Sequence, residues 1–245
     1  MYILALDGSG LTAGVAVLDE NKILADYSVN YKKTHSQTLL PMLDEVMKML
    51  EMDVSQIDYI ALTGGPGSFT GLRICAGMAK GLGLALDKPL VSVPTVEALA
   101  YNYEGSDKLI CPLMDARRNQ VYTGIYSFEN DNSEESNSKI HVISEQEAVS
   151  IQEILEKVNG LGREVVFLGD GVSVNEKYIR ELVKVPYRIA PAHLRMRNAA
   201  SVGRCALKMI SEEKLVSAMD FAPEYLRLSQ AERERMEKEK ANAEA

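Results

Sequence analysis

Two aspartates in this chain stand at the ends of short apolar runs, where a carboxylate could take part in phosphate chemistry. Asp7 is followed directly by Gly8, whereas Asp115 is followed two and three residues later by Arg117 and Arg118. In two-lobed phosphoryl-transfer proteins, such a strand-end aspartate faces Mg²⁺ and the phosphates across a cleft, because Mg²⁺ prefers oxygen ligands. The second turn lacks the glycine that lets a backbone approach a phosphate closely. We therefore predict that one half of such a site is lost and that the chain has no complete phosphoryl-transfer centre.

A glycine-rich segment at residues 64–71 joins a predicted strand to a predicted helix. Backbone N–H groups in such a loop can bind an anion at the start of a helix. The spacing does not fit a Walker A loop, because only three residues separate Gly67 from Gly71 and Leu72 stands where lysine is needed. We interpret the segment as a tight structural connection, with phosphate binding as the alternative.

The histidines and cysteines show no metal-binding spacing. The chain contains no HExxH, no HxxxH and no CxxC, and no two histidines are paired at helical spacing. A GxSxG motif is also absent, so Ser68 has no hydrolase context. We expect no bound metal, no metallopeptidase and no serine hydrolase. The residues considered are His35, His141, His193, Cys75, Cys111 and Cys205.

Composition and charge narrow the class of protein further. The chain has 245 residues and a formal net charge of −8, which does not suit direct, unaided binding to nucleic acid. The scattered cysteines indicate a reducing compartment, and the short first apolar run is not a signal peptide. No apolar run approaches the length of a membrane span, so we expect a cytoplasmic protein. Four later arginines are interpreted as solvated surface charges, with anion binding as the alternative: Arg188, Arg195, Arg197 and Arg204.

The helix predicted at residues 72–86 has no polar face. From Ile74 to Ala85 it carries one charge, Lys80, and small residues recur every four positions at Gly77, Gly81 and Ala85. A helix that is apolar all round must be covered all round. We predict a subunit interface over this ridge, with burial under the sheet and a second lobe as the alternative. The preceding helix, at residues 36–50, has a wide apolar stripe with adaptable methionines on one shoulder.

The remaining elements form two successive units of similar pattern. The first unit has predicted strands at 3–6, 13–18, 23–30, 58–63 and 89–93, the first three as an antiparallel meander, with helices at 36–50 and 72–86. The second has strands at 109–114, 120–128, 140–143 and 164–168, and helices at 145–158 and 199–210, the last capped by Asn198. Residues 129–139 are predicted to be a surface hairpin loop, and residues 230–245 a solvated tail. Two related lobes follow from this repetition.

Several motifs together resemble the TsaB (YeaZ) family. The most specific is the run GPGSFTGLR at residues 65–73, and the others lie at residues 35–41, 115–122, 169–171 and 223–227. The resemblance covers about residues 1–228. It implies an α/β, actin-like (ASKHA) two-lobed fold in which each lobe is a mixed sheet with helices. The lobes are expected at residues 1–104, as the partner-binding N-terminal lobe, and 105–228, as a degenerate C-terminal lobe, followed by a charged tail at 229–245.

The resemblance also implies a function. Members are the non-catalytic dimerisation subunit of the bacterial complex that forms N6-threonylcarbamoyladenosine at position 37 of tRNAs reading ANN codons. They pair with TsaD, a metal-bearing paralogue, and an ATPase, TsaE, joins them. Accordingly we expect contact with tRNA only through the complex, a homodimer as one state of the isolated chain, and no membrane partner. No cofactor is expected on the chain alone, and ATP or ADP at the junction of the complex stays open. The alternative function is a free-standing ATPase or small-molecule kinase of the same fold.

Two groups of residues are candidates for these contacts. The partner interface is expected to use residues of the two N-terminal helices: Leu39, Met42, Val46, Met49, Arg73, Gly77, Met78, Lys80, Gly81, Leu84 and Ala85. Nucleotide contact, if the chain makes it, is expected from the residues of the turns: Asp7, Ser9, Gly65, Gly67 and Asp115.

Overall fold

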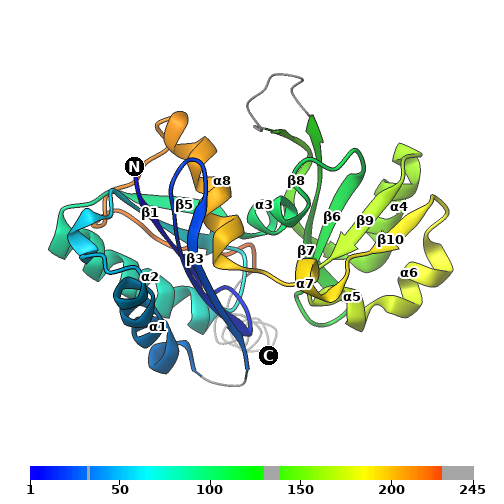
Figure 1. Ribbon diagram of the computed structural model, residues 1–245. Helices are drawn as coiled ribbons and strands as arrows, with labels where there is room; N and C mark the ends of the chain where they lie inside the picture. The colour runs from blue at the N-terminus through cyan, green and yellow to red at the C-terminus, as the bar shows by residue number, and fades with distance from the viewer. Residues whose placement is uncertain (32–33, 130–137, 228–245) are drawn as a thin grey trace, which may run out of the picture.

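The computed structural model describes residues 1–31, 34–129 and 138–227 (Figure 1). The predicted hairpin loop and the predicted tail lie almost wholly outside these residues. The first sheet has five strands in the order β3-β2-β1-β4-β5. Its strands are β1 (Ile3–Asp7), β2 (Thr12–Leu18), β3 (Ile23–Asn30), β4 (Tyr59–Gly65) and β5 (Leu90–Pro94). The meander is confirmed, because β1 pairs antiparallel with β2, and β2 pairs antiparallel with β3.

The second sheet repeats the topology of the first. Its order is β10-β9-β6-β7-β8, with β6 and β7 antiparallel, β7 and β8 antiparallel, and β6, β9 and β10 parallel. Its strands are β6 (Leu109–Asp115), β7 (Gln120–Glu129), β8 (Lys139–Ser150), β9 (Val165–Leu168) and β10 (Tyr187–Ile189). Strand for strand, this is the pattern of the first sheet. The prediction of two related units, each a mixed sheet with helices, is therefore confirmed.

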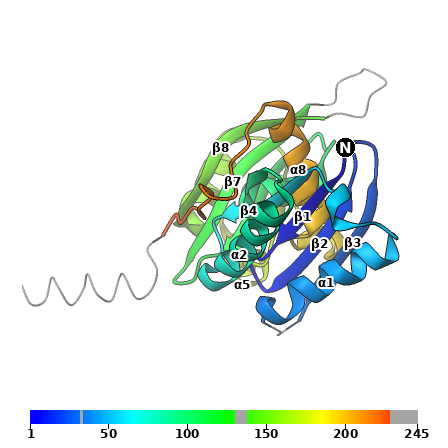
Figure 2. The same cartoon turned by 90° about the vertical axis from the view of Figure 1, so that its left-hand side faces the viewer.

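Helices form three layers around the two sheets. On the outer face of the first sheet lie α1 (His35–Met49) and α2 (Phe69–Leu86), as Figure 2 shows. Between the sheets lie α3 (Thr95–Ala100) and α8 (Ala199–Ser211), whose core cluster includes residues of both sheets. The outer face of the second sheet is covered by α4 (Ile151–Leu161) and α6 (Glu176–Leu182). Short elements complete the chain: η1 (Val54–Gln56), η2 (Tyr101–Tyr103), α5 (Gly171–Val174) and α7 (Ala192–Arg195).

Two predictions about the second unit differ from the structure. The helix predicted at 145–158 begins only at Ile151, because residues 145–150 continue β8 and pair with the long strand β7 as far as Gln120 and Ser150. The cross-strand pairing outweighs the local helical pattern, and Ser150 then caps α4 by accepting a bond from the N–H of Glu153. Helix α8, capped by Asn198 as predicted, was assigned to the second lobe but packs against β1, β2, β4 and β5 of the first sheet.

Candidate functional site

Helix α2 presents a bare ridge of small residues to solvent. Ser68 begins the helix by accepting a hydrogen bond from the N–H of Gly71, at 3.3 Å. The inner face packs on the sheet through the buried Leu72, Cys75, Ala76, Ala79 and Gly83. A Cβ atom added at Gly77 or at Gly81 would meet nothing within 4 Å. The ridge therefore faces away from the sheet, next to Leu84, which is 55% exposed.

The apolarity of α2 is unusual for a helix with so much exposed surface. It has 18 residues, of which 33% are buried, and by length and composition alone it is apolar enough to cross a membrane. The sequence-based statement that no apolar run approaches a membrane span was thus too strict. A core helix of a soluble protein passes the same test when most of it is buried, and α2 is not mostly buried. Its outer face is an exposed apolar surface, which monomeric proteins rarely present to water.

Several predicted interface residues lie in the core instead. Leu39, Met42 and Val46 are at most 4% exposed, because this side of α1 packs on β2. The predicted interface is therefore corrected at these three positions, because buried side chains offer no surface to a partner. Met49 is 76% exposed and remains on the outer face of α1. Met78 is half-buried against the core.

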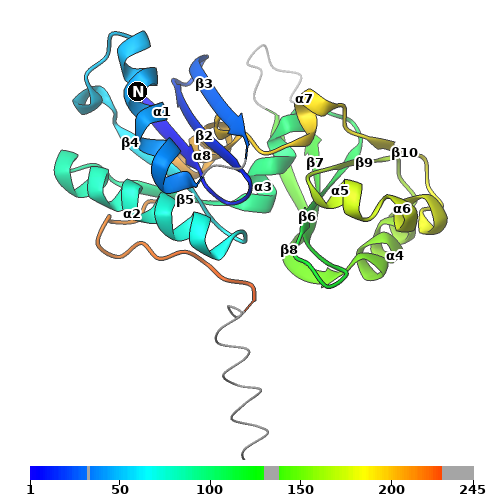
Figure 3. The ribbon, with the colours of Figure 1, turned by 90° about the horizontal axis from the view of Figure 1, so that it is seen from below.

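A C-terminal segment, of which the sequence singled out only residues 223–227, holds one flank of α2. This C-terminal strap, residues 214–227, runs beside α2 in Figure 3. Lys80 anchors it by donating hydrogen bonds to the carbonyls of Met219 and Phe221, both at 2.9 Å. Further along, the rings of Phe69 and Tyr225 pack at a tilt of 36°, with centroids 4.9 Å apart. Lys80 therefore has a structural role within the chain.

Arg73 belongs to the same contact. Its guanidinium carbon lies 3.9 Å from the centroid of the Phe69 ring, and its Nε donates to the Tyr225 hydroxyl at 3.2 Å. The side chain is nevertheless exposed. Arg73 thus connects α2 to the strap at the edge of the apolar ridge.

The glycine-rich loop packs tightly on the turn that follows β1. A Cβ atom at Gly67 would lie 2.4 Å from the carbonyl oxygen of Ser9, and one at Gly71 would lie 2.1 Å from that of Gly8. Ser68 also donates its N–H to the Ser9 carbonyl at 2.7 Å. These contacts need glycine for close approach, which supports the interpretation of the loop as a structural connection.

Gly65 is committed to the strap in the same way. Its φ angle is +122°, and a Cβ atom there would lie 2.1 Å from the carbonyl oxygen of Glu224. Beside it, the N–H of Glu224 donates to the Gly64 carbonyl at 2.7 Å. Gly65 is buried by this contact. It is therefore covered where a nucleotide contact was expected.

Asp7 is enclosed at the centre of the first lobe. Its Oδ1 accepts hydrogen bonds from the Ser9 N–H at 2.9 Å, the Ser9 hydroxyl at 2.7 Å and the Thr63 hydroxyl at 3.2 Å. Its Oδ2 is buried without a hydrogen-bond partner among the described residues. Asp7 and Ser9 are both fully buried, and of the two only Ser9 lines the cleft between the lobes.

An arginine fills the space beside the turn that follows β1. The side chain of Arg197 is 4% exposed, and its Nη2 lies 3.0 Å from Oδ2 of Asp170, across the gap between the lobes. A Cβ atom at Gly10 would overlap the same guanidinium. Arg197 was interpreted as a solvated charge, and that interpretation is wrong.

A cleft of about 580 Å³ opens above these residues, between the two lobes. One wall carries the glycine-rich loop and the other carries Asp115, whose Oδ1 accepts from the N–H of Arg117 at 2.7 Å. Asp115 is exposed, and its own N–H donates to Oδ1 of Asp170 at 3.1 Å. Of the predicted nucleotide contacts, only Asp115 and Gly67 reach the cleft surface without being fully buried.

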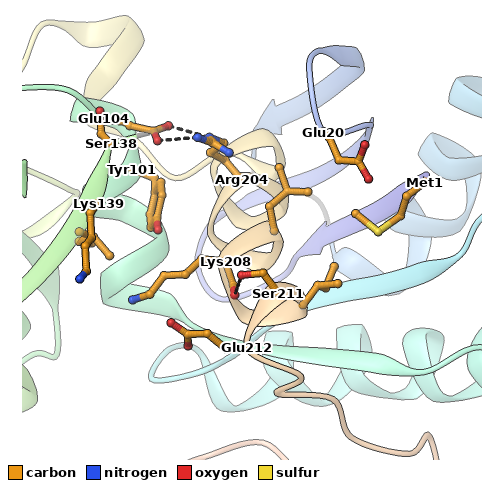
Figure 4. Close-up of a pocket in the computed structure, with 13 residues that line it drawn as sticks. Met1, Glu20, Tyr101, Glu104, Ser138, Lys139, Arg204, Lys208, Ser211 and Glu212 are labelled. Carbon is orange, nitrogen blue, oxygen red and sulfur yellow. Dashed lines mark hydrogen bonds and ion pairs between the residues drawn. The ribbon is translucent and has the colours of Figure 1, made fainter. Parts of the chain in front are cut away.

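A second hollow of about 510 Å³ lies at the opposite end of β1, beside Met1 (Figure 4). Arg204 of α8 makes two bonds of 2.9 Å to the carboxylate of Glu104 at its rim. The Nζ atom of Lys208 lies 3.7 Å from Oε1 of Glu97. These charges are already paired within the chain, so the hollow offers little for catalysis.

Within the described residues, no three His, Cys, Asp or Glu side chains gather as a metal ligand set. The thiols of Cys75, Cys111 and Cys205 are buried, and burial raises the pKa of each well above that of a reactive thiolate. These cysteines are structural.

Known proteins resemble the chain over almost its whole length. The family model of TsaD, tRNA N6-adenosine threonylcarbamoyltransferase, matches residues 22–235. The tRNA threonylcarbamoyladenosine biosynthesis protein TsaB of Bacillus subtilis (strain 168) is 34% identical over 98% of this chain and 100% of its own length. A tRNA N6-adenosine threonylcarbamoyltransferase of Mycoplasma mobile is 27% identical over 65% of this chain and 54% of its own.

The structural likeness agrees with the sequence likeness. YeaZ from Pseudomonas aeruginosa superposes with a TM-score of 0.75 at 25% identity, covering 92% of this chain and 99% of that one. The expected actin-like, two-lobed α/β fold is confirmed. With a relative this similar over the full length, the chain belongs to the TsaB (YeaZ) family of tRNA threonylcarbamoyladenosine biosynthesis proteins.

Proposed function

We propose that this chain is the non-catalytic dimerisation subunit of the bacterial complex that forms N6-threonylcarbamoyladenosine at position 37 of tRNAs reading ANN codons. It pairs with a TsaD-like paralogue, and a TsaE-like ATPase joins the pair in the cytoplasm. The observation that carries the proposal is the exposed apolar face of α2. The relatives named for this pathway supply the reaction.

The outer face of α2 fits a helix of a partner. At Gly77 and Gly81 no side chain covers the backbone, and the exposed Leu84 and Ala85 extend the apolar surface. Small residues at four-residue spacing let two helices approach closely, which increases the packing contact between them. A paralogue with the same fold presents an equivalent N-terminal helix, so two such lobes can meet face to face. The same surface serves a homodimer when the paralogue is absent.

The state of the cleft supports a non-catalytic role. Asp7 is buried, and the guanidinium of Arg197 occupies the space beside the first turn. A phosphoryl-transfer centre needs carboxylates open to Mg²⁺ and backbone groups open to phosphate. In this conformation Asp7 is closed to such a ligand, and Asp115 is the exposed one of the two strand-end aspartates. ATP or ADP at the junction of the complex would have to use the exposed rim near Asp115 and Gly67.

One observation favours the alternative of a free-standing ATPase or kinase: the cleft of about 580 Å³ is within the size range of small-molecule sites. Steady-state ATP hydrolysis by the purified chain decides between the two. Turnover that is lost in Asp7→Ala supports the ATPase, and absence of turnover supports the non-catalytic subunit.

Two experiments test the proposal directly. The chain and the TsaD-like paralogue of the same organism are co-expressed with a tag on one of them, and size-exclusion chromatography with light scattering gives the mass of the product. Separately, the gene is depleted and tRNA nucleosides are quantified by mass spectrometry. We expect a heterodimer, and loss of N6-threonylcarbamoyladenosine that the intact gene restores. Separate elution of the two proteins, or unchanged modification, refutes the proposal.

A further inference from the structure

The turn between β6 and β7 has an unusual backbone. Arg117, Arg118 and Asn119 are consecutive and have φ angles of +61°, +55° and +57°. The left-handed region costs free energy for every residue that has a Cβ atom. Elsewhere among the described non-glycine residues, positive φ angles occur singly. Runs of such residues persist only where the surroundings hold them, and they concentrate at functional sites.

Hydrogen bonds hold this turn rigidly. Asp115 accepts the N–H of Arg117 at 2.7 Å, and the N–H of Ala116 donates to the Gln120 carbonyl at 3.0 Å. The carbonyl of Asn119 accepts the N–H of Ile151, at the start of α4, at 3.3 Å. The two arginine side chains therefore start from a fixed base, and Arg117 lines the cleft. Such a base reduces the entropy lost when they bind a ligand.

The guanidinium groups of this turn have no partner within the described part of the chain. Arg117 and Arg118 are exposed and make no side-chain hydrogen bond or ion pair there. Every other described arginine uses its guanidinium in a hydrogen bond, an ion pair or both. These are Arg73, Arg163, Arg180, Arg188, Arg195, Arg197, Arg204 and Arg227.

A third guanidinium group contacts the same turn. Arg227, at the end of the strap, donates a hydrogen bond to the carbonyl of Ala116, directly before Arg117. Among the nearby carboxylates, Asp170 is paired with Arg197, and one oxygen of Asp115 is used by the turn itself. Three positive charges thus gather on a chain whose net charge is −8.

We propose that Arg117, Arg118 and Arg227 form an anion-binding cluster that contacts phosphate groups of the tRNA backbone, a proposal that rests on the function proposed above. Guanidinium groups bind phosphate oxygens through paired N–H donors. Two or three contacts are too few for the chain alone to bind RNA tightly. The cluster acts on tRNA that the assembled complex already holds, and it positions that tRNA from the cleft side.

The test uses the complex of this chain with its TsaD-like partner and a fluorescently labelled tRNA that reads an ANN codon. The dissociation constant is measured between 50 and 200 mM KCl for the parent and for Arg117→Gln/Arg118→Gln. Each phosphate contact contributes about 0.7 to 0.9 to the slope of log affinity against log salt. The double variant should therefore lower the slope by about 1.4 to 1.8. The matched control, Lys88→Gln/Lys184→Gln, removes two charges from other loops, whose side chains also have no partner among the described residues.

Each outcome decides the matter. A lower slope in the arginine variant and an unchanged slope in the control support the cluster. Equal slopes in all three proteins overturn it. Loss of the heterodimer in the arginine variant alone assigns the cluster to acidic groups of the partner protein and overturns the RNA contact. Failure of the parent chain to form the heterodimer refutes the proposed function itself, and the tRNA contact falls with it.

Discussion

Gly81→Arg separates the two roles that α2 could have, because it should change folding and partner binding in opposite directions. A Cβ atom at Gly81 meets nothing within 4 Å, so the chain alone has room for the larger side chain. Glycine in a helix interior is about 0.8–1.0 kcal/mol less favourable than alanine, and arginine is close to alanine. The isolated variant should therefore gain about 0.5–1 kcal/mol, and its Tm should rise by about 1–4 °C.

The same side chain should prevent the proposed complex. If a partner helix crosses the ridge at Gly81, the guanidinium is buried there without a counter-charge, at a cost of several kcal/mol. A loss of about 4 kcal/mol lowers the affinity about a thousandfold. Differential scanning fluorimetry measures the first effect, and titration of the labelled chain with the TsaD-like paralogue measures the second.

Gly160→Arg is the matched control. Gly160 is also an exposed helical glycine with nothing within 4 Å of its Cβ position, but it lies on α4 of the second lobe. The Gly160→Arg variant should bind the partner with the same affinity as the parent chain. The reasoning is refuted if Gly81→Arg binds within threefold of the parent, which removes the ridge from the interface. It is also refuted if the Tm falls by several degrees, which places Gly81 against its own lobe.

Three further changes test the interior. Arg197→Ala should lower the free energy of unfolding by about 2–3 kcal/mol in urea titrations, because it leaves the partly buried carboxylate of Asp170 unpaired. Burial raises the pKa of Glu97, so the stability that this carboxyl contributes is present in acid and is lost as the pH rises through its folded pKa. Glu97→Gln should therefore be more stable than the parent at pH 7, with the gain vanishing below about pH 4, and equal stability at both pH values would contradict this. Gly71→Ala should lower the free energy of unfolding by about 1–3 kcal/mol in thermal melts, because its Cβ would lie 2.1 Å from the Gly8 carbonyl oxygen.

The sequence predicted those elements whose signals are local. Alternating and apolar runs located β1, β2 and β3, and the loss of that alternation after His35 located α1. The Asn198 cap was readable because its side chain and the N–H that it binds are three residues apart. The glycine-rich loop was readable as a connection because its spacing fitted no phosphate motif.

What the sequence could not supply depends on contacts between distant segments. Leu39 and Met49 both belong to one wide apolar stripe, and only the packing of α1 on β2 shows that the first is core and the second is surface. The position of the strap also depends on a distant contact, because Lys80 binds residues that lie more than a hundred positions later in the sequence. The sequence could not distinguish Arg197 from the surface arginines, because its partner Asp170 is adjacent only in the folded chain.

The repeated topology shows that the exposed ridge is not a requirement of folding. After β4 and after β9, the chain enters a helical segment through a glycine-rich turn in both units. In the second unit this segment is short, and α6 turns charged residues to solvent, with Arg180 and Glu176 paired at 2.5 Å. A polar outer face is thus sufficient to cover such a sheet.

In the first unit the equivalent segment is α2, whose 18 residues turn glycine, alanine and leucine outward. An apolar outer face adds nothing to a lobe that its own core already stabilises, and it increases the risk of aggregation. The difference between two copies of one topology is therefore best explained by a second surface that covers α2. The proposed partner helix from a related lobe fits this role, because Gly77 and Gly81 leave room for two helix backbones in close contact.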